Sequence, residues 1–171
     1  MGLYISYCSK AISKNSDEDG YHINNPKCFS YQLGSLNRHN IYDISSDSES
    51  GHFSAGSYGG YGIWRNHLIE MCGYNSLIDV CNDIDFSKSV RYYKLNEIKT
   101  GVKFNSEPFY EIISFTDCDG SVGSEISKKL YNDFVNFDDK AKEQYDYFYE
   151  LYSNFKEAFR VASDNGLVNF H

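Results

Sequence analysis

The sequence has few of the residues that cross-link, break or anchor a chain. It contains two prolines, two methionines and one tryptophan in 171 residues, and its five cysteines form an odd set without CxxC spacing. This pattern excludes a fully paired disulfide framework and a zinc ribbon, and it is typical of a reduced compartment. No apolar run approaches the roughly 18 residues that a membrane span requires, and no secretory leader pattern opens the chain. We therefore predict a cytoplasmic protein with no membrane partner.

Basic residues are also scarce. The chain carries 16 Lys and Arg against 24 Asp and Glu, which gives a formal net charge of −8 and a pI near 5.0. A duplex DNA binder normally presents a basic face to neutralise phosphates, so the composition argues against duplex DNA as a partner. The five histidines lack HxxxH and HExxH spacing. The sequence therefore predicts no zinc site, and nothing in it implies a cofactor.

Aromatic side chains are abundant instead. Sixteen Tyr and twelve Phe bring the aromatic content to 17%, and tyrosine combines a large contact area with a hydroxyl that seeks a partner. Such a composition suits a binding cleft, although a codon bias in an AT-rich genome would also produce it. The length suits one domain over residues 1–171, which can bury a core without covalent cross-links.

Strands and helices are predicted by the spacing of apolar residues. Alternation over Gly2–Ser9 predicts a strand, and four further segments fit strands: Cys28–Leu33, Arg38–Ile44, Tyr92–Glu97 and Phe109–Phe115, with Leu167–Phe170 as a closing strand. Polar residues predict surface loops at Lys14–Asn25 and Asp43–Gly51.

Three helices follow from spacings of three and four. One runs from Ile63 to Gly73 behind a glycine-rich entry loop, one starts near Ser124, and one runs from Tyr145 to Ala162 with Gly166 as its stop. The order of elements predicts an α+β fold, with a single compact domain in which a small, mainly antiparallel sheet packs against two or three helices.

The first segment that could carry chemistry is Ser57–Arg65. If its glycines form a loop that enters a helix, free backbone N–H groups and the helix dipole would favour a phosphate there. Arg65 would add a charge, and three aromatic rings would stack on a base: Tyr58, Tyr61 and Trp64. The spacing matches neither known phosphate-loop fingerprint, so a structural turn with Trp64 in the core is the alternative.

The second segment is Phe115–Ser124, in which Asp117, Asp119 and Ser121 stand between a predicted strand and a helix. The Asp-x-Asp-Gly pattern invites comparison with the nucleophile motif of haloacid dehalogenases, and paired aspartates could also hold a divalent cation. Capping of the turn and the next helix is the structural alternative. We predict Asp117, Asp119 and Ser121 as ligand-binding residues, with no metal and no catalytic residue assigned.

The same segments carry a resemblance to a family of uncharacterised phage and bacterial proteins. The chain is similar to them in a Ser/Thr-Asp-Cys-Glu/Asp-Gly turn and a long aromatic helix, on these residues: Ser57–Tyr61, Trp64–Arg65, Asp117–Gly120, Gly123, Lys129–Leu130, Asp133–Phe134 and Asp164–Gly166. The chain has Asp119 where the pattern has Glu, and Ser124 where it has Pro. The resemblance implies a phage or mobile-element setting and brings no activity with it.

In that setting, the leading hypothesis is an accessory protein that binds and sequesters a small nucleotide-type ligand, as an anti-defence sponge for an immune signal. One alternative is a metal-dependent phosphoesterase that uses Asp117 and Asp119. The other is an acidic inhibitor that binds a host enzyme, for which the net charge of −8 is the support. We also expect a homo-oligomer.

Overall fold

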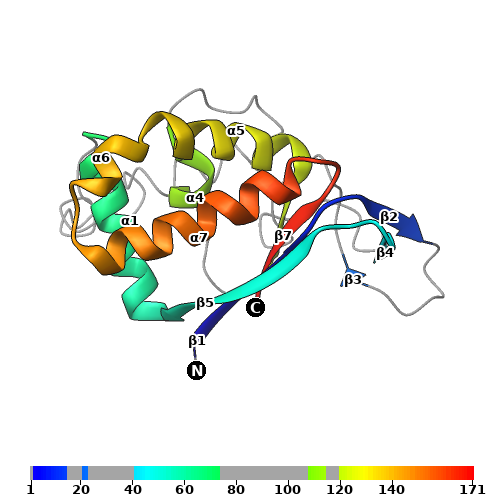
Figure 1. Ribbon diagram of the computed structural model, residues 1–171. Coiled ribbons are helices and arrows are strands. Elements are labelled where there is room, and N and C mark those ends of the chain that lie inside the picture. Colours follow the sequence, from blue (N-terminus) through cyan, green and yellow to red (C-terminus); the bar gives the residue numbers. More distant parts are fainter. Residues whose placement is uncertain (1, 15–20, 23–40, 74–107, 115–119) are drawn as a thin grey trace, which may run out of the picture.

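The fold is built on a four-stranded antiparallel sheet. The computed structural model describes residues 2–14, 21–22, 41–73, 108–114 and 120–171 (Figure 1). The sheet has the order β5-β1-β7-β6, with β5 at Ser50–Ser57, β1 at Gly2–Cys8, β7 at Leu167–Phe170 and β6 at Gly120–Gly123. The last strand of the chain therefore lies inside the sheet, between the first strand and β6.

Helices cover one face of this sheet. They are α1 (Tyr58–Met71), α4 (Tyr110–Ser114), α5 (Ser124–Asn136), α6 (Asp138–Lys142) and α7 (Asp146–Ala162). Figure 1 shows α7 lying next to the sheet, with α5 on the far side of α7. The predicted α+β class is confirmed, and so are the predicted strands at the two ends and the last two helices.

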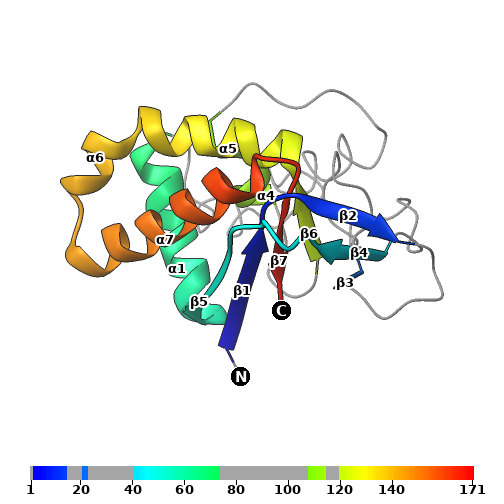
Figure 2. The same cartoon turned by 45° about the vertical axis from the view of Figure 1, so that its right-hand side comes forward.

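A second, smaller sheet lies beyond the end of β1. It has the order β2-β4-β3, with β2 at Ala11–Lys14, β4 at Ile41–Ile44 and β3 at Tyr21–His22. Figure 2 shows it to one side of the helical layer, where β1 leads into β2. The assignment of residues 1–171 to one domain stays a prediction, because residues 74–107 lie outside the described part of the chain.

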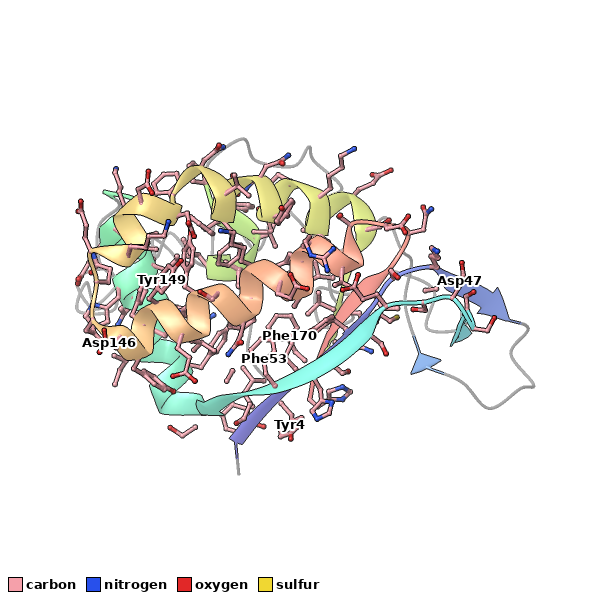
Figure 3. All side chains as sticks on the ribbon, viewed as in Figure 1. Tyr4, Asp47, Phe53, Asp146, Tyr149 and Phe170 are labelled. Atoms are coloured by element: carbon pink, nitrogen blue, oxygen red, sulfur yellow. The ribbon has the colours of Figure 1, made fainter. Side chains whose placement is uncertain are left out.

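The core is aromatic and lies between α7 and the sheet. Figure 3 shows Phe53 and Phe170 on the side of the sheet that faces α7. Phe155 of α7 contacts both, with ring centroids 5.0 Å from Phe53 and 6.1 Å from Phe170. The fully buried side chains of α7 recur at helical spacing, and they include Phe148, Tyr152, Phe155 and Phe159. The aromatic residues of the last helix are therefore explained by packing.

The turn from α7 into β7 fits closely against the end of β1. Lys10 N donates to Asp164 O at 2.8 Å, and Ala11 N donates to Asn165 O at 3.0 Å. Gly166 is buried beneath this contact, and a Cβ atom placed on it would lie 1.8 Å from the Cys8 carbonyl oxygen. Glycine is needed here because two backbone segments approach more closely than a side chain allows.

Two predicted elements were wrong, and four strands were not predicted: β2, β3, which falls in the predicted loop Lys14–Asn25, β5 and β6. The glycine-rich stretch from Tyr58 to Gly62 is not an entry loop but the first part of α1, which begins after Ser57. Residues Phe109–Phe115 were predicted as a strand, yet Tyr110–Ser114 form the helix α4. Strand β5 was missed because its Ser and Gly residues hide the alternation. The predicted strands Cys28–Leu33 and Tyr92–Glu97 lie outside the described residues.

In the part of the chain that the structure describes, no helix is long and apolar enough to cross a membrane.

Candidate functional site

The first predicted segment is built into the core. Tyr61 and Trp64 are fully buried, and the Trp64 indole N–H donates to the Phe148 carbonyl at 3.2 Å. The Trp64 ring also stacks on Phe155, with centroids 4.9 Å apart. In this structure neither Tyr61 nor Trp64 has a face on which a base could stack. We correct their predicted role accordingly: burial makes both rings part of the core.

The other two predicted binding residues of this segment, Arg65 and Tyr58, also pack toward the interior. Arg65 is 4% exposed, its guanidinium lies 5.1 Å from the Tyr61 ring centroid, and one of its amino groups donates to Ile113 O at 3.5 Å. Tyr58 is partly buried against the core. The Ser57 hydroxyl accepts from Gly60 N at 3.0 Å, so a side chain caps this helix end where a phosphate was predicted.

The second predicted segment is described only in part. Asp117 and Asp119 lie outside the described residues, so their predicted roles stay predictions. Ser121 lies in β6, is 8% exposed, and donates its hydroxyl proton to Asn169 Oδ1 at 2.6 Å. It is the one predicted residue that the structure places on the face of the sheet opposite the helices.

On that face, Ser121 ends a row of polar side chains that crosses all four strands. Ser6 in β1 pairs with His52 in β5 on one side and with Asn169 in β7 on the other, and Asn169 pairs with Ser121. Residues directly opposite each other in an antiparallel sheet point to the same face. The polar row is therefore His52, Ser6, Asn169 and Ser121. Leu3 and Ile5 of β1 point to the other face and are fully buried in the core.

Two further side chains contact the polar row. His171 follows β7, and its Nε2 lies 2.7 Å from Ser6 Oγ. Tyr4 stacks on His52, with ring centroids 6.0 Å apart and 21° between the planes. Figure 3 shows Tyr4 on the side of the sheet away from the helices, and the residue is 50% exposed. The row thus has an aromatic, open end at β5 and a buried amide and hydroxyl end at β6.

The surface is hollowed along this row. A cavity of about 230 Å³ is lined by residues of β1, β5 and β7: Ser6, Tyr7, Cys8, Ser50, Gly51, His52, Leu167 and Asn169. None of these lining residues is Asp, Glu, Lys or Arg. The Cys8 thiol is no nucleophile at neutral pH, because burial raises its pKa to about 11. The cavity therefore offers hydroxyl, amide and imidazole groups, without a fixed charge.

A second polar cluster lies between α4 and α5. Lys129 contacts Glu111 at 2.6 Å and Asp133 at 2.9 Å, and Asp133 also accepts from Phe109 N at 2.9 Å. Glu111 is 2% exposed, and burial raises the pKa of its carboxyl. The cluster ties α4 to α5. The residues that the structure describes contain no group of three His, Cys, Asp or Glu that could hold a metal ion.

Sequence analysis found one of the four residues in the polar row. Ser6, His52 and Asn169 lie in three different strands, and positions 6, 52, 121 and 169 are brought together only by the strand order and register. The alternation in β1 was the available signal, because it placed Tyr4 and Ser6 on the face opposite Leu3 and Ile5.

Comparison with known proteins gives no relative for this chain. No protein-family model matches it, and neither a curated protein nor a solved structure does.

Proposed function

We propose that the protein binds a small nucleotide-type ligand on the polar face of its four-stranded sheet. The observation that carries this proposal is the polar row: its Ser6 hydroxyl, His52 imidazole and Asn169 amide line one cavity, and the exposed Tyr4 ring stacks on His52. Binding sites for small ligands typically combine a concave surface with a few convergent polar groups. The predicted ligand class is retained, while the predicted stacking residues are replaced by Tyr4 and His52.

The dimensions of the row suit a ring joined to a sugar. Neighbouring strands lie about 4.8 Å apart, so His52 and Asn169, which are two strands apart, are separated by roughly 10 Å. A base that stacks at the Tyr4 and His52 end would leave its sugar near Ser6, within reach of Asn169. With Asn169 Oδ1 held by Ser121, the amide NH2 is oriented to donate to a ligand oxygen.

The chemistry of the lining favours the uncharged part of such a ligand. Hydroxyl, amide and imidazole groups both donate and accept hydrogen bonds, as the edges of bases and ribose hydroxyls do. A free phosphate would meet no Lys or Arg among the residues that line the cavity. We therefore expect nucleosides and nucleotides to bind through the base and sugar, with phosphate groups directed outward. That the ligand is an immune signal, sequestered in a phage setting, remains a prediction that rests on the resemblance.

Thermal unfolding in the presence of nucleosides, mononucleotides and cyclic dinucleotides tests the proposal. A ligand at about 100 times its dissociation constant should stabilise the folded protein by about 2.7 kcal/mol. Chromatography of the ligand released after heating then separates sequestration, which returns it intact, from catalysis, which converts it.

Two tyrosines provide a matched pair of variants. Tyr4 and Tyr147 are 50% and 52% exposed, but only Tyr4 stacks on a residue that lines the cavity, His52. Tyr4→Ala should reduce the ligand-induced shift, whereas Tyr147→Ala should leave it unchanged. Equal effects of both substitutions, or no stabilisation by any compound of the panel, would rule out this site.

The hydrogen bond between Ser6 and His171 favours a second candidate function. A serine hydroxyl 2.7 Å from an imidazole nitrogen has the geometry of a nucleophile beside its general base. In the described residues no carboxylate contacts His171 to orient its ring, so ligand binding remains our first proposal. If the released ligand is converted and Ser6→Ala abolishes the conversion, the protein is an enzyme with Ser6 at its centre.

A further inference from the structure

The outer edge of β5 is the second feature of the sheet that invites a partner. Strand β5 pairs with β1 along one side, and no described residue pairs with its other side. At eight residues it is the longest described strand, whereas β6 at the opposite edge has four. An edge strand of this length presents a row of backbone N–H and C=O groups that a further strand can use.

The sequence of β5 lacks the devices that usually protect such an edge. Its residues are Ser-Gly-His-Phe-Ser-Ala-Gly-Ser, with no proline and no Lys, Arg, Asp or Glu. Natural edge strands are commonly blocked by proline or by charged side chains, lysine above all. In a chain with a net charge of −8, an uncharged strand is a place where two identical copies can meet without direct repulsion. This property selects a second copy over a charged partner.

We propose that two copies of this chain pair antiparallel along β5 and form one continuous eight-stranded sheet. The interface is the same segment in both copies, as a two-fold symmetric dimer requires. An antiparallel pair of identical edges has its two-fold axis perpendicular to the sheet. The axis therefore keeps the helices of both copies on one side and the two polar faces on the other.

This pairing completes the cavity. On the β5 side the cavity is lined by Ser50, Gly51 and His52, so the second copy adds a wall next to His52. The partner's His52 and the partner's Ser54 then lie on the same face, adjacent to the first cavity. This arrangement puts two equivalent cavities side by side. If the cavities bind ligand as proposed above, the pair suits a ligand with two heterocyclic rings.

Sedimentation of the full chain over a range of concentrations tests the dimer without any ligand. We expect twice the 19.7 kDa chain mass at high concentration. Ser54 is exposed on β5, and Ser54→Lys or Ser54→Glu should each weaken dimerisation at least tenfold, because the two-fold axis brings like charges close together. Asn132→Lys changes an exposed residue of α5 and serves as the control that leaves the dimer intact. Circular dichroism of each variant checks that it is folded.

Cysteine cross-linking locates the interface. The two-fold axis places one residue of β5 directly opposite the same residue of the second copy, and a cysteine at that position should form an intermolecular disulfide. If the axis lies at position 52 or 54, His52→Cys or Ser54→Cys alone should form the disulfide. If it lies at position 53, residue 52 of one copy is opposite residue 54 of the other, and only a mixture of the two variants should form it. A monomer at every concentration overturns the proposal, and so does a dimer that neither Ser54 variant weakens. A dimer that forms while every ligand fails would leave this inference standing and remove only the proposed function.

Discussion

Replacing Gly166 by alanine should destabilise the protein far more than a single methyl group normally does. The added Cβ would lie 1.8 Å from Cys8 O and 2.8 Å from Ser9 Cα, whereas a carbon and a carbonyl oxygen ordinarily approach to about 3.3 Å. The turn after α7 would have to move by about 1.5 Å relative to the end of β1. Both sides of the contact are backbone, so no side chain can rotate away.

The expected cost combines two effects. Strain from overpacking costs about 1–3 kcal/mol, and the movement would break the bonds from Lys10 N to Asp164 O and from Ala11 N to Asn165 O, each worth about 1 kcal/mol net. We therefore expect the free energy of unfolding to fall by about 3–5 kcal/mol, a large part of the 5–15 kcal/mol typical of a domain. Urea unfolding followed by circular dichroism measures the change.

Gly62→Ala is the matched control, because the same atom is added where nothing lies within 4 Å. Gly62 is in the interior of α1, where alanine should stabilise the helix by about 0.5–1 kcal/mol. The same Gly→Ala substitution should thus lower the free energy of unfolding at position 166 and raise it at position 62. If Gly166→Ala unfolds at the wild-type urea concentration, the close approach of the α7 turn to β1 is refuted.

Three further predictions concern the interior. Burial raises the pKa of Glu111 above its ordinary value of 4.5, so the folded protein holds this proton to higher pH than the unfolded chain does, and the free energy of unfolding should decrease as the pH rises through that interval. Glu111→Gln should remove this part of the pH dependence, which amounts to about 1.4 kcal/mol per unit of pKa difference. Urea unfolding from pH 4 to 8 measures it, and a variant that keeps the wild-type pH dependence would contradict the prediction. Trp64→Phe should lower the free energy of unfolding by about 2–3 kcal/mol, because it leaves a cavity and removes the hydrogen bond to Phe148 O. Calorimetry measures this, and an unchanged unfolding temperature would contradict it. With its pKa near 11 and 3% exposure, Cys8 should react with a thiol reagent at pH 8 only after the protein unfolds. Mass spectrometry of labelled peptides tests this, and modification of Cys8 in the folded protein would contradict it.

Elements with a strong local pattern could be predicted from the sequence. The spacing of Phe148, Tyr152, Phe155 and Phe159 predicted α7, and the alternation of Leu3 and Ile5 predicted β1, because in both elements a single buried face imposes the period. The outcome for α4 shows the limit of such patterns. Its aromatic and β-branched residues are typical of a strand.

The helical state of α4 is stabilised by contacts that its own sequence does not contain. Phe109, with φ of 55°, precedes the helix and donates its N–H to Asp133, while Glu111 is paired with Lys129. Both partners belong to α5, so tertiary contacts override the local preference. The polar row escaped prediction for a related reason: each strand contributes one residue to it, and the register that aligns them is a property of the whole sheet.

The place of β7 in the sheet has a consequence for protein synthesis. Strand β1 leaves the ribosome long before its neighbour β7, which is made more than 150 residues later, since Ile5 pairs with Phe170 and Cys8 with Leu167. Val168 and Phe170, which close the core, arrive with it. Until then β1 and β6 cannot be joined, and the face that holds Ser6 and Asn169 does not exist. Under the proposed function, a nascent chain should therefore bind no ligand until β7 has left the ribosome, and binding should appear in one step once that strand joins the sheet.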